Sequence, residues 1–390
     1  MDISFLLILG VILILSVLSC KITSKRGLPL LVGFILIGII IGRNFDFVSV
    51  DNAVQICNFA LMFIIFTGGF QTDFSSAKPV LGVSSLLTVA GTALTAGLVA
   101  AFAYFILGFD FMAAMLLGAV LSATDAASVF SVLNSNKLKL KNNLGSVLEI
   151  ESGSNDPIAY LLTVVFLAFA TGDSINVPLL LLIQVIIGAA AGFAIGFLGR
   201  RMINRLNLEI NGLYAVLLCG IALLTYGLSI QFGGNGFLAV YIGGIVLGSG
   251  KLVYKEHLST LFSSVSMLMQ ILLFIVLGIL WIPEAFFTVM LAGLIIAVFM
   301  IFVARPAVII LILKPFKYKM NEIAFVSWAG LRGASSIVFS TYLLSAGLPF
   351  AEYIFGVVFF VCLLSVVLQG SLLATLAKRL GLVISENEKD

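Results

Sequence analysis

Four charged side chains stand out among those inside the long apolar stretches of this sequence: Asp125, Glu151, Asp156 and Arg332. A charge in the core of a membrane costs at least about 2.5 to 3.5 kcal/mol, so charged residues at such positions are functional candidates. Asp125 follows Thr124 within residues 118–128, a stretch of small and hydroxylated residues that we expect to be easily interrupted. An unwound turn at Thr124 and Asp125 would free backbone carbonyl oxygens that can replace the hydration shell of a small cation. The alternative, that Asp125 only caps or pairs helices, stays open.

The second cluster of polar residues is segment 149–157, which reads Glu-Ile-Glu-Ser-Gly-Ser-Asn-Asp-Pro. On a helix, Ser152 and Asp156 share one face, and Glu151 and Asn155 share the neighbouring face. A hard cation prefers several oxygen ligands, which Asp156, Ser152 and the carbonyl or hydroxyl of Thr124 would supply together. We therefore expect Asp125 and Asp156 to bind either a proton or a cation. The competing interpretation is a helix N-terminus, where the helix dipole also favours acids and serines.

Arg332 lies in a second small-residue segment, 327–336, that we also expect to break. An unpaired guanidinium in the membrane would be very costly, so the sequence predicts a carboxylate partner, for which we choose Glu151. An alternative is that Arg332 attracts an anionic substrate.

These residues must be positioned by helices in a membrane. Of the 390 residues, 61% are hydrophobic and 10% are charged, against roughly 25% charged in soluble domains, and the mean hydropathy is +1.22. This composition excludes a water-soluble globule and predicts an all-α polytopic membrane protein. Thirteen apolar runs are candidate spans: 5–20, 28–43, 54–70, 80–108, 111–133, 145–171, 177–200, 211–231, 236–249, 258–282, 285–313, 322–346 and 351–377.

The basic residues between these runs predict the orientation. Fifteen Lys and Arg side chains fall in the odd-numbered loops, whereas the even-numbered loops hold only Arg43. Because basic loops stay in the cytoplasm, we expect an integral plasma (inner) membrane protein with its N-terminus outside and its C-terminus in the cytoplasm. The first run lacks the basic start and cleavage pattern of a signal peptide, and we interpret it as the first span.

The sequence contains no motif for ATP hydrolysis or enzymatic catalysis. There is no Walker motif, no His/Cys metal cluster and no nucleophile constellation, so we expect neither an ATP-driven pump nor an enzyme, and no cofactor. Nucleic acid is not an expected partner, since the net charge is only +3.

A weak similarity between residues 127–131 and 335–340 hints at an internal duplication. Counted from the start of one segment to the start of the other, the chain crosses the membrane seven times. Because this number is odd, related segments there would be inverted in the membrane, as in many transporters.

At these residues the sequence strongly resembles the NhaP-like branch of the bacterial monovalent cation:proton antiporters. The motifs that match are Thr124-Asp125, the Glu-Ser-x-x-Asn-Asp segment from Glu151 to Asp156, and the Gly-x-Arg-Gly segment from Gly330 to Gly333. The resemblance implies inverted repeats with crossed, broken helices. It also implies that Asp125, Asp156, Ser152 and Thr124 hold the monovalent cation, that Asn155 stabilises the site, and that Glu151 and Arg332 form a structural ion pair.

The same resemblance implies a function: exchange of Na⁺ or K⁺ for protons, in the service of pH homeostasis, by alternating access of a homodimer in membrane lipid. Asn155 stands where electrogenic relatives carry a second acid, which is typical of electroneutral exchange. The segment from Glu151 to Asp156 is similar to a sub-branch often assigned to potassium, whose members usually continue into a cytoplasmic region. A cation channel or uniporter, and an anion symporter that uses Arg332, remain alternatives.

The resemblance also divides the chain. Residues 1–79 and 172–282 are expected to form a dimerisation domain, residues 80–171 and 283–380 the two repeats of a mobile core domain, and residues 381–390 a short cytoplasmic tail.

Overall fold

Helices form the architecture of this protein in the computed structural model, which describes residues 10–18, 30–44, 48–72, 78–136, 138–206, 208–281 and 286–384. Over these ranges the β-type pairing is one isolated antiparallel bridge, between Leu140 and Val383. The prediction of an all-α chain is therefore confirmed. Residues 10–18 of the first apolar run are helical, and the rest of that run lies outside the described ranges.

The helices coincide with the apolar runs of the sequence. In chain order they are α2 (Leu30–Asn44), α3 (Val50–Gln71), η1 (Lys78–Val80), α5 (Leu81–Leu86), η2 (Leu87–Gly91), α6 (Thr92–Phe105), α7 (Phe111–Leu121), α8 (Ala126–Ser135), α9 (Leu144–Thr171), α10 (Val177–Arg205), α11 (Asn211–Gln231), α12 (Gly236–Gly248), α13 (Lys255–Ile279), α14 (Phe286–Phe299), η4 (Met300–Ala304), α15 (Arg305–Leu313), η5 (Lys314–Phe316), α16 (Met320–Trp328), α17 (Ala334–Ser345), α18 (Ala351–Ser365), η6 (Val366–Gly370) and α19 (Ser371–Arg379).

Length and composition make many of these helices membrane spans. Within the described ranges, eight helical stretches are long and apolar enough to cross a membrane, and four shorter apolar helices accompany them. These features support a polytopic membrane protein. The number of thirteen crossings stays a prediction.

Polar residues define where several spans begin. The side chains of Ser49, Asp110, Asn176 and Asn235 each accept a hydrogen bond from a backbone N–H in the first turn of the helix that follows. Such N-caps satisfy donors that the first turn of a helix leaves without partners. In a chain with so few polar residues, these isolated caps set the boundaries between apolar helices.

The same order of elements occurs twice in the chain. A long helix containing a π-helical segment (residues 78–105) precedes the broken helix α7–α8 and the long helix α9. In the second half, a helix with π segment η4 (residues 286–316) precedes the broken helix α16–α17 and the long helix of residues 351–379. A π turn inserts an extra residue into a helix and recurs at functional sites. The duplicated order agrees with the weak sequence similarity, and the inverted orientation stays a prediction.

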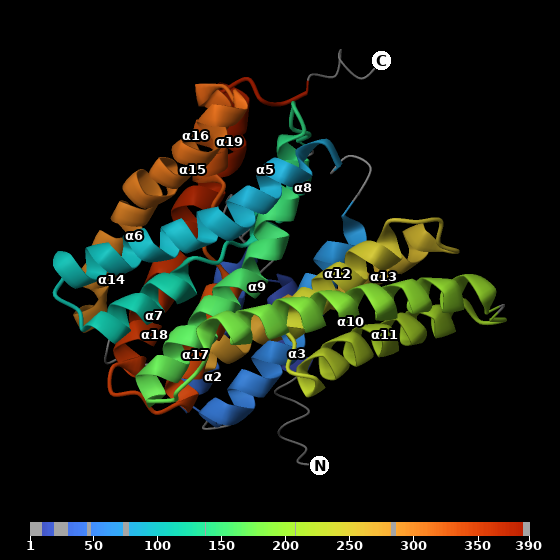
Figure 1. Cartoon of the computed structure of the whole chain (residues 1–390), viewed down its shortest axis with the longest axis horizontal. Helices are drawn as coiled ribbons and strands as arrows, with labels where there is room; N and C mark the ends of the chain where they lie inside the picture. The colour runs from blue at the N-terminus through green and yellow to red at the C-terminus, as the bar shows by residue number, and fades with distance from the viewer. Residues whose placement is uncertain are drawn as a thin grey trace.

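Two groups of helices pack among themselves. The first packing group is α2, α3 and α10–α13, and the second packing group comprises α5–α9 and α14–α19. Figure 1 shows α10, α11 and α13 extending to one side of the molecule, away from α6, α14, α15 and α16. The groups meet where α3, α12 and α13 contact α9 and α17. Both broken helices therefore belong to the second packing group, and one of them, α17, reaches its boundary with the first.

Close approach of backbones holds the first packing group together. A Cβ on Gly196 of α10 would lie 2.7 Å from the carbonyl oxygen of Gly243 on α12. Small residues permit this contact, which supplies dispersion energy where lipid gives no hydrophobic drive for association.

This contact predicts that Gly196→Ala lowers stability, because the added methyl group forces α10 away from α12. Overpacking of this kind costs about 1–3 kcal/mol, and the thermal unfolding midpoint in one detergent should fall. Gly220→Ala on α11 is the matched control, since a Cβ there meets nothing within 4 Å. Equal midpoints for the two variants would contradict this description of the packing.

Candidate functional site

The two broken helices meet at their breaks. The helical hydrogen bonding stops between α7 and α8 at residues 122–125 and between α16 and α17 at residues 329–333. The backbone N–H of Asp125 donates to the carbonyl oxygen of Leu331, with N and O 2.8 Å apart. A side chain at Gly333 would clash with the Asp125 carboxylate, so the absence of a Cβ lets the breaks touch. The expected interruption at Thr124 and Asp125 is therefore present.

Opposite charges lie at the two helix ends of the first break. The Asp125 carboxylate accepts from the backbone N–H of Ser128 at 3.1 Å and from its hydroxyl at 2.6 Å, so it caps the N-terminus of α8. Nη1 of Arg332 donates to the carbonyl oxygens of Ser122 and Ala123 at 2.7 and 2.8 Å, at the C-terminal end of α7. An acid at a helix N-terminus and a guanidinium at a C-terminus both complement the helix dipole. The capping alternative for Asp125 is thus part of the structure.

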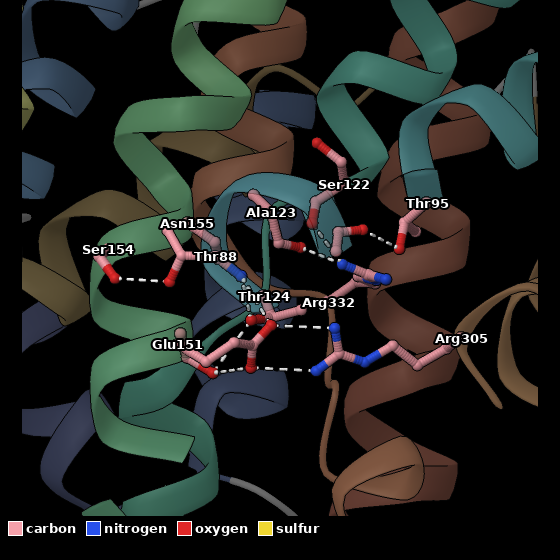
Figure 2. A network of polar contacts seen from close by, with 12 residues as sticks. Thr88, Thr95, Ser122, Ala123, Thr124, Glu151, Ser154, Asn155, Arg305 and Arg332 are labelled. Carbon is pink, nitrogen blue, oxygen red and sulfur yellow. Dashed lines mark hydrogen bonds and ion pairs between the residues drawn. The ribbon is translucent and has the colours of Figure 1, made fainter. Parts of the chain in front are cut away.

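The predicted Glu151–Arg332 ion pair is wrong, because Glu151 pairs with Arg305. Nη1 and Nη2 of Arg305 donate to the two oxygens of Glu151 at 2.9 and 3.0 Å, a bidentate contact. Both side chains are buried, with exposed fractions of 3% and 1%. Arg305 begins α15 directly after π segment η4, and Figure 2 shows its guanidinium facing Glu151 while Arg332 points to Ser122 and Ala123.

The physical reason for the correction is that Arg332 finds carbonyl oxygens at the end of α7, which need no formal negative charge. The sequence also contains an indication of Arg305. Like Arg332, it is an arginine inside an apolar run, in this case residues 285–313. The small residues around Arg332 favour that segment over Arg305, because such residues are typical of a helix that breaks.

A chain of hydrogen bonds ties the first break to this ion pair. The Thr124 hydroxyl donates to Ser152 at 3.0 Å and accepts from the amide of Asn155 at 2.5 Å. The Ser152 hydroxyl in turn lies 3.3 Å from Glu151 Oε2, to which it donates. As predicted, Glu151 and Asn155 share one face of α9. Asn155 contacts Thr124 from this face, and Figure 2 shows the network. Each hydroxyl oxygen donates once and accepts once, which leaves a lone pair on each for a further ligand.

Asp156 differs from the other buried acids of the site. Its Oδ2 accepts a hydrogen bond from the hydroxyl of Ser335 on α17, with the oxygens 2.6 Å apart. Its Oδ1 is buried and has no hydrogen-bond partner among the described residues, and 6% of the residue is exposed. A buried carboxylate oxygen without a partner is costly. Oδ1 is therefore ready to take a proton or a cation.

A cavity of about 420 Å³ reaches this carboxylate. It lies between the two packing groups, with residues 61–71 of α3 and 263–274 of α13 on one side and residues of α8, α9 and α17 on the other. Asp125, Asp156, Ser152 and Ser335 line its inner part, and hydroxyl and amide groups line the opposite wall: Thr67, Gln71, Ser263, Ser266 and Gln270.

The arrangement offers carboxylate and hydroxyl oxygens to a hard cation. Asp125, Asp156 and Ser152 converge on the cavity, and the Thr124 hydroxyl lies 3.0 Å from Ser152. Oxygen donors of this kind select alkali and alkaline-earth cations rather than soft metals. In the part of the chain that the structure covers, no cluster of three His, Cys, Asp or Glu side chains could hold a metal ion.

Comparison with known proteins finds relatives along almost the whole chain. Residues 10–379 match the family described as sodium/hydrogen exchanger, transmembrane. The chain is 34% identical over 386 residues to the K(+)/H(+) antiporter NhaP of Alkalimonas amylolytica, an alignment that covers 97% of this chain and 67% of that protein. It is also 34% identical over 387 residues to the K(+)/H(+) antiporter NhaP2 of Shewanella oneidensis, covering 96% of this chain and 67% of that protein.

A shorter relative and a solved structure match end to end. The Na(+)/H(+) antiporter NhaH of Halobacillus aidingensis is 27% identical over 411 residues, covering 95% of this chain and 96% of that protein. The structure of the sodium proton antiporter MjNhaP1 from Methanocaldococcus jannaschii at pH 8 superposes with a TM-score of 0.84 at 24% identity, covering 95% of this chain and 97% of that one. This likeness establishes a shared fold.

The corrected ion pair predicts a specific pattern of coupling. Glu151→Gln or Arg305→Gln alone should lower stability by about 3–5 kcal/mol, because each leaves an uncompensated buried charge, whereas the double variant should recover part of that loss. Glu151→Gln combined with Arg332→Gln should instead be close to additive. Thermal unfolding of the purified variants in one detergent measures both cycles. A larger coupling for Glu151 with Arg332 than with Arg305 would contradict the observed pairing.

Proposed function

This chain belongs to the sodium/hydrogen exchanger family, and we propose that it is a secondary-active antiporter that exchanges a monovalent cation, Na⁺ or K⁺, for protons. The observation that carries the proposal is Oδ1 of Asp156, a buried carboxylate oxygen without a partner among the described residues, at the inner end of a cavity lined by oxygen donors. The relatives are named K(+)/H(+) and Na(+)/H(+) antiporters, which supports the same class of reaction.

Competition for Asp156 couples the two ions. A carboxylate that has bound a cation cannot also hold a proton, so loading one ion releases the other. The cation would take Asp156, Ser152, Asp125 and Thr124 as oxygen ligands. Asn155, Glu151 and Arg332 would stabilise the site, with Arg305 as the partner of Glu151 that the sequence had not indicated.

The position of the cavity supports an inward-open state. Its lining includes residues 61–71 of α3, 149–156 of α9 and 263–274 of α13. The nearest basic residues along the chain to the end of α3 and to the starts of α9 and α13 are Lys78, Lys141 and Lys255. Since basic loops stay in the cytoplasm, the cavity would open to the cytoplasm. The N-terminus would then face outside and the C-terminus the cytoplasm, in a plasma membrane.

Aromatic side chains close the opposite side. Rings of Tyr160, Phe237, Phe339 and Tyr342 lie 5.3 to 6.2 Å apart between α9, α12 and α17, with Tyr160 one turn beyond Asp156. The hydroxyl of Tyr342 donates to Asn58 of α3 at 2.5 Å. For alternating access the second packing group would move against the first, which requires these contacts between the groups to separate.

We extend the proposal to assembly and stoichiometry. The first packing group would form a homodimer in lipid, and the second packing group would be the mobile core, in accord with the domain boundaries expected from the sequence. Asn155, next to Asp156, is a neutral amide and not a second acid, which supports electroneutral exchange of one cation for one proton.

Two rival functions were considered. A cation channel or uniporter would conduct without moving protons, and the aromatic barrier between the cavity and the outer side argues against it. An anion symporter would need Arg332 to face substrate, but that side chain lies outside the lining of the cavity and donates to helix carbonyls.

Proton flux in proteoliposomes tests the proposed function. With a pH dye inside, pulses of Na⁺ or K⁺ should collapse a pH gradient, pulses of choline should not, and an ionophore that clamps the membrane potential should leave the rate unchanged. Asp156→Asn should be silent because its side chain cannot exchange a proton. Asp173→Asn, an exposed site outside the cavity, should behave like wild type. Exchange at the wild-type rate in Asp156→Asn would refute the mechanism.

The outer barrier predicts a change in accessibility. Tyr342→Phe removes the hydrogen bond to Asn58, so the outward-open state should become about fivefold more populated, the factor that roughly 1 kcal/mol represents. Buried Cys57, the neighbour of Asn58 on α3, reports this opening. Its alkylation by an impermeant maleimide from outside, followed by peptide mass spectrometry, should accelerate by that factor. Tyr353→Phe on α18 is the control, and equal rates in both variants would argue against this barrier.

A further inference from the structure

Ser335 forms a hydrogen bond with Asp156 to which the proposed mechanism gives no role so far. It is the second residue of α17, it is 6% exposed, and it lines the cavity beside Asp156 and Asp125. Its hydroxyl donates to Asp156 Oδ2 at 2.6 Å, the length of a hydrogen bond to a charged oxygen. This contact joins α9 of the first repeat to α17 of the second.

The two acids of the cavity are held in different ways. Ser128, which holds Asp125, lies three residues further along the chain, so that contact is local to the start of α8. Ser335 is 179 residues from Asp156, so that contact depends on how α17 packs against α9. Ser335 therefore links the ion bound at Asp156 directly to the start of α17, next to the α16–α17 break.

The charges around Asp156 make its orientation matter. Asp125 and Glu149 line the same cavity, and Glu151, five residues before Asp156 on α9, is paired with Arg305 from α15. Arg332 is engaged with the carbonyl oxygens at the end of α7. The group that touches Asp156 directly from the second repeat is Ser335, at the N-terminal turn of α17, where the helix dipole also favours an anion.

We propose that Ser335 is a positioning residue of the cation site: it holds Oδ2 of Asp156 against the start of α17, so that Oδ1 alone is presented to the incoming cation. This inference rests on the proposed exchange function and adds a residue to its site. With one oxygen fixed, the carboxylate presents a single ligand at a fixed place, which makes the fit to cations of different radius unequal. Ser335 thereby contributes to affinity and to the discrimination between Na⁺, K⁺ and Li⁺.

The test compares Ser335→Ala with Ser335→Thr, which keeps the hydroxyl. Ser340→Ala is the matched control, because Ser340 is buried on the same helix and its hydroxyl bonds only to Ile337 of its own turn. In proteoliposomes with Na⁺, K⁺ or Li⁺ chloride, Ser335→Ala should raise the KM of the preferred cation about tenfold, the factor expected for one hydrogen bond to a charged group. The ratios of KM among the three ions should narrow, and kcat should change less than KM. Ser335→Thr should restore both, and Ser340→Ala should match wild type.

A second readout separates this inference from the proposed function. The preferred cation should raise the thermal unfolding midpoint of purified wild type and Ser335→Thr, and this shift should be lost in Ser335→Ala, with choline as the control. Exchange by the wild type together with unchanged KM values in Ser335→Ala would overturn the role of Ser335 and leave the function standing. Cation stabilisation that depends on Ser335, in a wild type that exchanges no ions, would overturn the function and leave the role of Ser335 standing. Neither exchange nor stabilisation in the wild type would overturn both.

Discussion

The structure depends on finding a partner for every charge buried where the two broken helices cross. In that environment a lone charge costs several kcal/mol. Asp125 caps the N-terminus of α8, and Arg332 donates hydrogen bonds to the C-terminal carbonyl oxygens of α7. Glu151 and Arg305 form an ion pair with each other. The breaks are thus stabilised by opposite charges at opposite helix ends, which allows irregular backbone to persist inside a membrane domain.

Among the buried acids of the site, Asp156 is the one that keeps an oxygen without a partner in the described part of the chain, and the proposed function follows from it. One of its oxygens is held by Ser335, and the other has no partner among the described residues. An occupant of either kind, proton or cation, lowers the charge at the boundary between the packing groups. A site without that charge can pass the apolar side chains of the boundary, such as Leu61 and Phe274, more readily than an ionised one. Ion binding would in this way control the movement that exposes the site first to one side of the membrane and then to the other.

Much of the fold and site could be predicted from the sequence because hydrophobicity and charge are so sharply separated. The apolar runs coincide with helices, and the small-residue stretches around Thr124 and Arg332 are the two breaks. The i, i+4 spacing on α9 correctly grouped Ser152 with Asp156 and Glu151 with Asn155. Contacts between distant segments could not be read in this way, since spacing says nothing about which helix packs against which. The contact of Arg305 with Glu151 joins residues 154 positions apart. The contact of Ser335 with Asp156 joins residues 179 positions apart.

The most direct measurement of the central claim is proton release on cation binding. Purified protein in weakly buffered detergent solution, with a pH dye, would be mixed rapidly with Na⁺ or K⁺ chloride while cation binding is titrated in parallel. If proton and cation compete for Asp156, close to one proton should be released for each cation bound, and Asp156→Asn should release none. Saturable cation binding without proton release in the wild type would contradict the account, because the two ions would then occupy separate sites.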